Sequence, residues 1–586
     1  MKRTIINDLS IKNKGESVSV SGWVQKSRRM GSLIFVDVRD VTGIVQLVFS
    51  DKGELFKKAE SLRNEFVIQS TGKVVERKSK NKNIKTGDIE IICDSLNILS
   101  KSSRLPMLIQ DDTDALENVR MNYRYLDLRR PVMRDRIIAR SNFNKITHDY
   151  FNENGFINIE TPILTKPTPE GARDFLVPSR VVPGSFFSLP QSPQLYKQLL
   201  MISGFDKYYQ IAKVFRDEDS RKDRQVEFTQ LDIEMSFMSI DEIMNTLEEY
   251  VKLVFRKLDN FSGSEKFERI SYDNAMNTYG SDRPDTRFNL LLNDGVELFK
   301  DIDVNFIKDS ISKKKTIKYI KLDKKLSGKD HKELESFVKS HGANGLLFYS
   351  FDSSTKNYSG FLSKHITQNE KAYKKFKSNF GENNDYSFLA IIGDWKQTCE
   401  QLGSLRLELS NRYLTVDNSL RNFIWVTDWP LFEYDKETKL FSSVHHPFTK
   451  PTSETAQYLD TDPAKVRSLA YDIVLNGSEI GGGSLRIHDK EMQYKVFEIL
   501  GLSKNEIKEK FSFFIDAFEF GVPPHGGIAF GVDRIMQIIT DSSSIRDVIA
   551  FPKSTSGVAE MEKAPSNMPA DLLNDLSIII KDNVKG

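Results

Sequence analysis

The chain has 586 residues, of which 39% are hydrophobic and 28% charged, a composition typical of a globular protein with several domains. Its formal net charge is only +2, which excludes a global field that attracts nucleic acid, so any such binding must come from local patches. Two cysteines exclude a disulfide framework and a zinc-finger pattern, and the sequence has neither an apolar run of membrane-spanning length nor a signal-peptide core at its start. We therefore expect a cytoplasmic protein that does not enter a membrane.

The first hundred residues predict a five-stranded barrel. Five segments between residues 17 and 99 are rich in β-branched side chains, and residues 51–64, before the fourth segment, have a helical pattern. This is the layout of an OB barrel, a common binder of single-stranded nucleic acid. The region is also basic, with 18 Lys and Arg against 12 Asp and Glu.

Phe35 and Gln46 lie on two of these predicted strands, near a basic turn that contains Arg28. An exposed aromatic ring at this place would stack on a base, which contributes roughly 1–3 kcal/mol. The residues support equally an interpretation in which Phe35 belongs to the barrel core and the basic turn is only solvated.

Residues 100–122 are polar and irregular, which indicates a linker. From residue 131 to 153 apolar side chains recur at helical spacing, and residues 155–162 end this helix and begin a strand. A loop rich in Pro and Gly, 165–173, then precedes a predicted helix over 192–203.

Residues 208–235 predict two strands joined by a charged loop. The second strand, 228–235, alternates strictly, and Asp232 and Glu234 share its polar face. One interpretation of that face is a solvated sheet edge. Arg216, at the end of the first strand, argues against it, because a fixed cation above a floor of carboxylates and amides suits an anionic ligand that must be oriented.

The composition shifts near residue 280. Residues 285–414 are rich in Lys, alternate predicted helices and strands, and lack the clustered polar motifs found on either side. We interpret them as an inserted domain, after which motif-bearing sequence resumes and runs to about residue 551.

A hairpin with an Asn-Gly tip at 476–477 is predicted over residues 470–480. In that register Val474 pairs with Glu479, and Asp472 shares the face of Val474, so two carboxylates lie diagonally across the ladder. Like charges so placed repel unless a cation lies between them, and a divalent ion held by one or two carboxylates and substrate phosphates is typical of Mg²⁺. Two exposed acids on a hairpin are the simpler alternative.

Three glycines, 481–483, precede Arg486, whose guanidinium fork suits a carboxylate or a phosphate. Arg534 follows a Gly-rich stretch and lies in the first turn of a predicted helix, where a cation is unfavourable unless an anion such as a triphosphate offsets it. The adjacent His445 and His446 lack a further ligand at zinc spacing, which favours a polar lining over a metal site.

Taken together, these stretches resemble the class II aminoacyl-tRNA synthetases. In chain order, residues 155–162, 215–234 and 526–534 resemble the three motifs of that class, the first of which forms its dimer interface. The strings QSPQLYK (191–197) and TPEGARD (168–174) resemble the bacterial-type members that are specific for aspartate. The resemblance extends over essentially the whole chain.

The resemblance implies a multidomain α+β fold with an N-terminal OB-fold β-barrel that binds the anticodon, an antiparallel-sheet catalytic domain and an inserted α/β domain. We predict the barrel at residues 1–103, a hinge at 104–130, the two parts of the catalytic domain at 131–284 and 415–586, and the insertion at 285–414.

The implied activity is the ligation of aspartate to tRNA-Asp. Aspartate first reacts with ATP to give aspartyl-adenylate and pyrophosphate, and the 3′-terminal adenosine of the tRNA then attacks the adenylate. The protein mainly positions the substrates and stabilises developing charge. The implied partners are L-aspartate, ATP, tRNA-Asp and a second copy of the chain, with Mg²⁺ as cofactor, and neither DNA nor a membrane.

The resemblance also assigns roles to single residues. Catalysis is implied for Arg216, Glu479 and Arg534. Contacts with ATP are implied for Arg216, Asp217, Glu218, Gln225, Glu479, Gly531, Val532, Asp533 and Arg534. Contacts with aspartate are implied for Glu170, Gln194, Lys197, Arg216, Asp232, His445 and Arg486. Asp472 and Glu479 would bind Mg²⁺, in agreement with the hairpin geometry, and Arg28, Phe35 and Gln46 would meet the anticodon.

Lys197 and Arg486 are predicted to select aspartate over asparagine. A hydrogen bond to a charged group contributes roughly 1.5–3 kcal/mol, and an amide would leave both cations under-compensated. Asp232 is expected to steady the two cations.

Three alternatives stay open. Asparaginyl- and lysyl-tRNA synthetases share the barrel and the motifs, but Gln194 with Lys197 and the insertion argue against them. A non-catalytic nucleic-acid-binding paralogue would be expected to lack the ATP arginines or the metal acids, which are present. Some family members also charge tRNA-Asn with aspartate, and the turn at residues 29–31 lacks the His-Gly step of those forms, which favours strict specificity for tRNA-Asp.

Overall fold

The structure is a computed structural model that describes residues 2–50, 53–167, 172–218, 223–263 and 266–580. It comprises two compact units, residues 1–135 with 560–562, and residues 136–559 with 563–586. The finer domain boundaries at residues 103, 130, 284 and 414 stay predictions.

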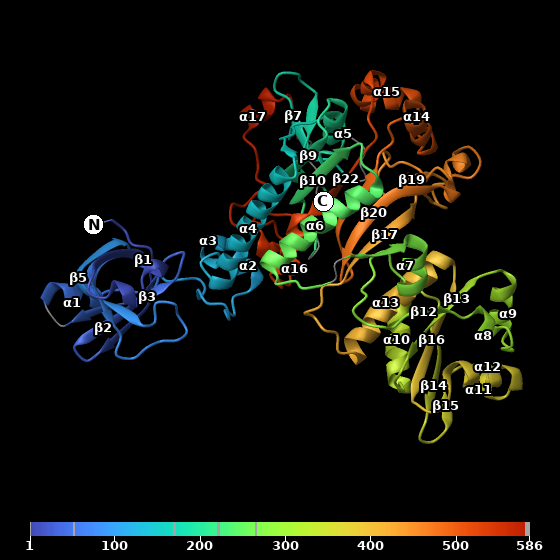
Figure 1. Cartoon of the computed structure of the whole chain (residues 1–586), viewed down its shortest axis with the longest axis horizontal. Coiled ribbons are helices and arrows are strands. Elements are labelled where there is room, and N and C mark those ends of the chain that lie inside the picture. The colour runs from blue at the N-terminus through green and yellow to red at the C-terminus, as the bar shows by residue number, and fades with distance from the viewer. Residues whose placement is uncertain (1, 51–52, 168–171, 219–222, 264–265, 581–586) are drawn as a thin grey trace. The chain divides into compact units, whose positions relative to one another are not determined.

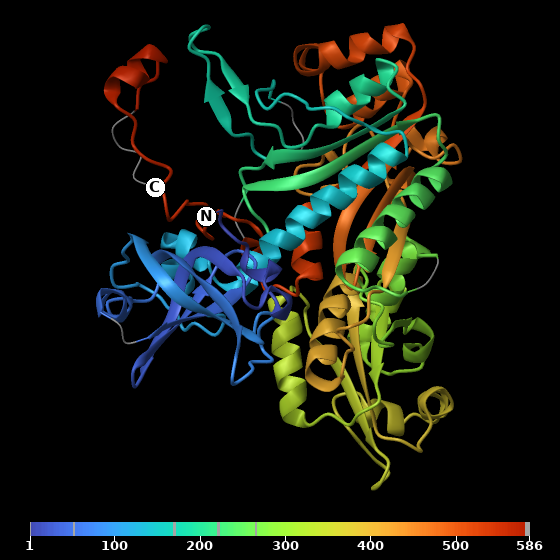
Figure 2. The same cartoon turned by 60° about the vertical axis from the view of Figure 1, so that its left-hand side comes forward.

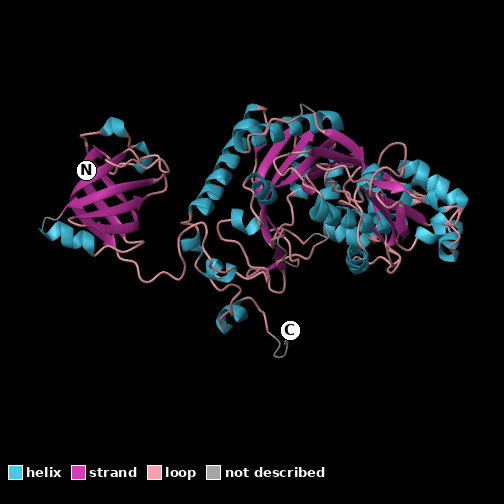
Figure 3. Cartoon of the chain, turned by 90° about the horizontal axis from the view of Figure 1, so that it is seen from below, coloured by secondary structure: helices cyan, strands magenta, loops and turns pink. Residues whose placement is uncertain are grey.

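The first unit is built on a closed five-stranded barrel with the strand order β1-β2-β3-β5-β4 (Figures 1 and 3). Alternate side chains of each strand, among them Val36 and Leu47, point into one hydrophobic core. The prediction of an OB barrel with a helix before its fourth strand is confirmed. Its elements are η1 Ile6–Asp8, η2 Ile11–Asn13, β1 Ser17–Met30, β2 Leu33–Arg39, β3 Ile44–Ser50, α1 Gly53–Glu60, β4 Val67–Glu76 and β5 Ile89–Ser100.

Two short helices, α2 (Glu117–Asn122) and α3 (Arg124–Asp127), follow the barrel. The prediction of an irregular linker over residues 100–122 is therefore wrong at its end. Asp127 is fully buried and accepts hydrogen bonds from Arg124 at 2.6 Å and from Arg130 at 2.7 Å. This buried ion-pair cluster orders a segment that has too few apolar residues for periodicity to reveal a helix.

The second unit contains an eight-stranded sheet with the order β11-β17-β20-β21-β22-β10-β9-β6. All neighbours are antiparallel except the pairs β11–β17 and β6–β9, which are parallel. The strands are β6 Ile157–Asn158, β9 Lys207–Phe215, β10 Glu227–Ser236, β11 Glu268–Ser271, β17 Phe423–Pro430, β20 Arg467–Leu475, β21 Ser478–Leu485 and β22 His525–Gly531.

Two long helices, α4 (Pro131–Glu153) and α6 (Ile240–Leu258), lie along one face of this sheet (Figure 2). Their apolar residues, for example Phe143 and Leu247, share one core with Ile233 and Ile528 of the sheet. The predicted helix over residues 131–153 is thus confirmed. The same unit contains α5 Gln194–Ile202, α7 Tyr272–Tyr279, α14 Lys490–Ile499, α15 Lys504–Ile515, α16 Val532–Ile539 and α17 Ala570–Asp575, with short elements β7 Leu176–Pro178, β8 Phe186–Ser188, β18 Phe432–Tyr434, β19 Phe441–Ser443, η3 Ala456–Leu459, η4 Pro463–Lys465, η5 Asp516–Phe520 and η6 Ile545–Val548.

The region predicted as an insertion forms its own five-stranded antiparallel sheet, in the order β12-β13-β16-β14-β15. Its elements are β12 Leu292–Asp294, α8 Val296–Phe299, α9 Asn305–Ser312, β13 Thr316–Leu322, α10 Gly328–Ser340, β14 Leu347–Asp352, β15 Asn357–Ser359, α11 Ser363–Thr367, α12 Glu370–Phe380, β16 Tyr386–Gly393 and α13 Trp395–Tyr413. Helix α13 packs closely on the end of α7. A Cβ at Gly403 would lie only 2.1 Å from the carbonyl oxygen of Gly280, so this contact requires glycine. Among the described residues, no helix is both long and apolar enough to cross a membrane.

Candidate active site

The candidate site lies on the sheet face opposite α4 and α6, and β10 forms its floor. β10 pairs with β9 on one side and with β22 on the other, so it is not a sheet edge. Leu231 and Ile233 alternate into the core beneath the helices, whereas Asp232 and Glu234 point to the opposite face and are also fully buried. The alternative of a solvated edge is therefore wrong.

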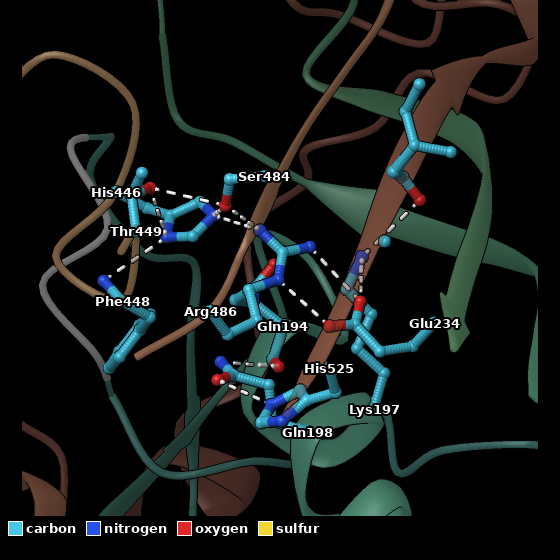
Figure 4. Close-up of polar contacts among 12 residues, drawn as sticks. Gln194, Lys197, Gln198, Glu234, His446, Phe448, Thr449, Ser484, Arg486 and His525 are labelled. Carbon is cyan, nitrogen blue, oxygen red and sulfur yellow. Dashed lines mark hydrogen bonds and ion pairs between the residues drawn. The ribbon is translucent and has the colours of Figure 1, made fainter. Parts of the chain in front are cut away.

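Two cations, Lys197 and Arg486, neutralise these buried carboxylates, and Figure 4 shows both beside Glu234. Lys197 of α5 donates to Oδ1 of Asp232 at 3.0 Å, and its Nζ lies 3.5 Å from Oε2 of Glu234. Arg486, just after β21, forms a fork with Glu234 in which Nε donates to Oε1 at 2.9 Å and Nη2 to Oε2 at 3.1 Å. Asp232 thus contacts Lys197, whereas the direct partner of Arg486 is Glu234, for which no role was predicted.

Burial and ion pairing act in opposite directions on the two carboxyl groups. Burial raises the pKa of Asp232, and the charge of Lys197 offsets this only in part. Burial also opposes ionisation of Glu234, but Arg486 and Lys197 outweigh it and hold the pKa of Glu234 below its usual range. Oδ2 of Asp232 and Nε2 of Gln194 are buried without a hydrogen-bond partner among the described residues. Orphaned atoms of this kind are available to a ligand.

His446 and Ser484 complete the shell around Arg486 (Figure 4). Nη1 of Arg486 donates to Oγ of Ser484 at 2.6 Å and contacts Nε2 of His446 at 2.5 Å. Burial, and then the charge of Arg486, lower the pKa of His446 well below 6.5, so its neutral ring accepts this bond. Nη1, the nitrogen of Arg486 that does not contact Glu234, therefore faces only the neutral acceptors Ser484 and His446.

The state of His446 leads to a prediction about pH and stability. Folding lowers the pKa of His446, so at mildly acidic pH this side chain binds a proton in the unfolded chain but not in the folded one. The free energy of unfolding that is present at neutral pH is therefore lost as the pH falls below 6.5. The slope is at most about 1.4 kcal/mol per pH unit. His446→Gln keeps a neutral acceptor, so the drop in Tm between pH 7.5 and 5.5 (roughly the range in which histidine titrates) should be smaller than in the wild type. His341→Gln, at an exposed position, should leave the drop unchanged; an equal drop in all three proteins would contradict the prediction.

A cavity of about 230 Å³ lies beside this network, between β10, β21 and the start of α16. It is lined by seven of the residues implied for ATP, namely Arg216, Glu218, Gln225, Glu479, Gly531, Asp533 and Arg534. The guanidinium of Arg216 lies 5.2 Å from the centre of the Phe228 ring, and its Nε is buried without a partner among the described residues. Nη1 of Arg534 donates to the carbonyl oxygen of Glu479 at 2.8 Å, which fixes this cation over β21.

The predicted hairpin brings Asp472 and Glu479 together. Val474 pairs with Glu479 and Asp472 with Gly482, and a bulge at Ile480 lies between these two pairs. A Cβ at Gly482 would lie 2.8 Å from Oδ1 of Asp472 and 3.4 Å from Oε1 of Glu479, so only glycine leaves room between them. The pairing predicted from the Asn-Gly tip is confirmed.

The electrostatics of this pair depend on its burial. Burial, and next the charge of Asp472, raise the pKa of Glu479. Nε2 of His445 donates to Oδ1 of Asp472 at 3.1 Å. Burial opposes the charged form of His445, but Asp472 and Glu479 outweigh burial and raise the pKa of His445. Among the described residues, no group of three or more His, Cys, Asp or Glu side chains is arranged to hold a metal ion alone. A cation at this hairpin would need further oxygen ligands, such as phosphates.

A second, larger cleft of about 1080 Å³ adjoins the first. Arg216 and Glu479 line both, and His445 and Asp472 line the larger one, whose far wall is formed by α7 and α13. Arg216 therefore stands at the junction of the two spaces.

Glu170, implied for aspartate, lies outside the described residues, and two contacts implied for ATP differ from this arrangement. Asp217 lines a neighbouring cleft together with Arg173, and not the cavity that Arg216 lines. Val532 is fully buried in the main core, so its side chain cannot meet ATP and only its backbone is available. Conversely, Phe228 and Arg283 line the cavity although no role was predicted for them; the strict alternation of residues 228–235 was the signal that placed Phe228 on the polar face.

In the barrel, Arg28 and Gln46 contact one acid, and Phe35 pairs with Arg28 between β2 and β1. Phe35 and Asp37 lie on the outward face of β2, because Ile34, Val36 and Val38 between them fill the core. Asp37 accepts from Nη2 of Arg28 at 2.9 Å and from Nε2 of Gln46 at 3.3 Å. The interpretation of Phe35 as a core residue is therefore wrong.

Comparison with known proteins places the chain in a family. A family model for class II tRNA synthetases (D, K and N) matches residues 116–555, and one for an OB-fold nucleic acid binding domain matches residues 18–99. The chain is 45% identical over 591 residues to an aspartate–tRNA(Asp/Asn) ligase of Caldanaerobacter subterraneus, covering 99% of this chain and 98% of that protein. It is 46% identical over 579 residues to an aspartate–tRNA ligase of Ruminiclostridium cellulolyticum, covering 98% and 97%. The solved asparaginyl-tRNA synthetase of Pyrococcus horikoshii, complexed with asparaginyl-adenylate, shares the fold with a TM-score of 0.59 at 19% identity, covering 94% of this chain and 98% of that one. The chain belongs to the class II tRNA synthetases of the D, K and N group.

Proposed function

We propose that this chain is an aspartate–tRNA ligase. The proposal rests mainly on the position of Arg216, which lines both spaces. One is the cavity lined by Arg534, and the other is the cleft lined by His445 and the acidic hairpin. A cation at such a junction can meet an α-phosphate from one side and an attacking carboxylate from the other. The relatives named as aspartate–tRNA ligases, similar over nearly the whole chain, support the same substrate.

In the proposed first step, an oxygen of the aspartate α-carboxylate attacks the α-phosphorus of ATP. The bond from that phosphorus to the oxygen bridging to the β-phosphate breaks, and pyrophosphate leaves. Negative charge builds up between the attacking and leaving oxygens, where Arg216 would stabilise it, while Arg534 would hold the far phosphates. In the second step a ribose hydroxyl of the terminal adenosine attacks the adenylate carbonyl, and AMP leaves.

Asp472 and Glu479 are the residues that would hold Mg²⁺. Two carboxylates facing one glycine, with the pKa of Glu479 raised by burial and then by Asp472, form a donor set that fits a hard divalent cation. When bound, the ion would neutralise phosphate charge during the transfer. Glu218 and Gln225 complete the cavity wall, and Gln225 is held by the backbone N–H of Lys553, which donates to its Oε1 at 2.9 Å.

The buried network suggests how aspartate is selected. Lys197 and Arg486 are already balanced by Asp232 and Glu234, so asparagine would not leave these two cations without a counter-charge. The neutral contacts of Nη1 of Arg486 supply a better reason. A substrate carboxylate that replaces His446 and Ser484 there exchanges a neutral acceptor for a charged one, whereas the amide of asparagine offers no such gain.

We propose two further partners, a second copy of the chain and a tRNA. A homodimer through residues 155–162 is supported by three exposed apolar side chains in this segment or just after it, Ile157, Ile163 and Leu164, whose exposed fractions are 48%, 51% and 50%. Exposed apolar side chains of this kind are typical of protein interfaces.

For the tRNA we propose tRNA-Asp. Relatives of near-equal similarity bear either the Asp or the Asp/Asn name, so sequence identity does not distinguish a tRNA-Asp-specific enzyme from one that charges both tRNAs.

The proposed function is tested by ATP-dependent transfer of labelled aspartate to purified tRNA. We expect aspartyl-tRNA from tRNA-Asp, and a much lower rate with tRNA-Asn. Equal rates on both tRNAs would establish the non-discriminating form, and transfer to neither would contradict the assignment.

Phe35→Ala in the barrel should weaken tRNA charging while adenylate formation survives. The ring lies on the outward face of β2, and a base stacked on it contributes roughly 1–3 kcal/mol, so the KM for tRNA should rise by about 5- to 150-fold. Val36→Ala, its inward neighbour, is the matched control: it should lower thermal stability without a selective effect on tRNA. A parallel loss of pyrophosphate exchange and charging in the Phe35 variant would contradict a contact with tRNA.

A further inference from the structure

Asp533, the residue before Arg534, has both carboxylate oxygens hydrogen-bonded to the protein. Its Oδ2 accepts from the backbone N–H of Thr229 on β10 at 2.9 Å, and its Oδ1 accepts from Nη1 of Arg140 on α4. The exposed fractions of the two side chains are 6% for Asp533 and 17% for Arg140. Although Asp533 lines the cavity, both oxygens of its carboxylate are thus directed to the protein.

Arg140 acts together with a second arginine of α4. Nη1 of Arg140 also donates to the carbonyl oxygen of Val548 at 3.2 Å, and Arg136, one turn earlier, lies 3.5 Å from Asp547. Residues four apart lie on the same face of a helix, so the two arginines address one neighbour. The two arginines contact both ends of the segment formed by α16 and η6, Asp533 at its start and Asp547 at its end. Between these ends, the cavity-lining residues are Arg534 and Ile545.

We propose that the Arg140–Asp533 ion pair positions Arg534 for the triphosphate of ATP. Through Asp533 the first turn of α16 is joined to both α4 and β10, and the same turn carries Arg534 to its place over β21. A displacement of a positioned group by about 1 Å can cost up to about 10²-fold in rate. Arg140 also neutralises a carboxylate that would otherwise compete with the phosphates for the adjacent guanidinium.

This inference rests on the proposed function, since its readout is ATP use in aspartate-dependent pyrophosphate exchange. Arg140 touches no substrate in this account and is a positioning residue. A purely structural role would lower stability, or would change the KM values for ATP and aspartate together. A positioning role for Arg534 changes the KM for ATP selectively.

The test compares Arg140→Met, Asp533→Asn and the double variant with the wild type. We expect each single variant to raise the KM for ATP roughly tenfold, within the range of coupling energies for neighbours in one ion-pair network, while the KM for aspartate changes by less than twofold. The double variant should be no worse than the poorer single one, because both remove the same interaction. ATP affinity measured by calorimetry without aspartate should fall in parallel.

Lys145→Met is the matched control, since Lys145 lies on the same helix and pairs with Asp149 at the exposed surface. Its KM values should equal those of the wild type. Arg140→Lys keeps the charge and should recover most of the ATP affinity, which separates positioning from a failure to fold. Equal changes in both KM values, or additive effects in the double variant, would overturn the inference. A wild type without aspartate-dependent exchange would instead contradict the proposed function.

Discussion

Replacing Arg486 with leucine is expected to lower kcat/KM for aspartate in pyrophosphate exchange by at least about 10²- to 10³-fold. Arg486 and Glu234 have exposed side-chain fractions of 1% and 0%, so the change leaves a buried carboxylate without its partner. Breaking such a pair from one side costs roughly 3–5 kcal/mol. The variant also loses Nη1, the donor that we propose for the substrate carboxylate.

Arg406→Leu is the control for this variant. Arg406 is also 1% exposed, but it lies in α13 and donates to the carbonyl oxygens of Leu290, Asp285 and Phe288 rather than to a carboxylate. It should lower the Tm of the chain while the KM for aspartate stays within twofold of the wild-type value. If both variants lost aspartate activation to the same degree, the effect of Arg486 would be one of folding alone, and its role in selection would be contradicted.

Replacing Arg216 with leucine is expected to lower kcat of exchange by about 10²- to 10³-fold, with the KM for ATP changed much less. Removing one preorganised donor to a charge that develops only in the transition state has an effect of this size. Arg216→Lys should recover part of the rate, because lysine keeps the charge but not the fork that meets two oxygens at once.

Arg224→Leu serves as the comparison for Arg216, since Arg224 lines the same cavity and pairs with Glu218 at 2.9 Å. Its side chain is 51% exposed, and an exposed ion pair contributes at most about 1 kcal/mol, so its kcat should fall by less than tenfold. A variant of Arg216 that raised the KM for ATP and kept kcat would contradict a role in the transition state.

Much of the fold was predictable because local signals were strong. The Asn-Gly tip fixed the hairpin register, so the meeting of Asp472 and Glu479 followed from residue counting. Alternation placed Asp232 and Glu234 on one face, and helical spacing after Pro131 gave α4 its observed bounds.

The features of the fold and the site that were not predictable depend on contacts between segments far apart in the sequence. Glu234 and Arg486 are 252 residues apart, and nothing local in either segment indicates that they form a fork. The same holds for Arg140 and Asp533, 393 residues apart, whose ion pair engages a residue that also lines the cavity. The helices α2 and α3 were missed because buried ion pairs, and not an apolar stripe, hold them.

The central claim is that this site activates aspartate. It is tested most directly by pyrophosphate exchange of the wild-type chain with each of the twenty amino acids in turn, at saturating ATP. We expect exchange with aspartate alone, with asparagine lower by roughly 10⁴-fold, as in sites that bind a polar group by buried charged partners. Exchange supported by asparagine or lysine at a comparable rate, or by none of the twenty, would contradict it.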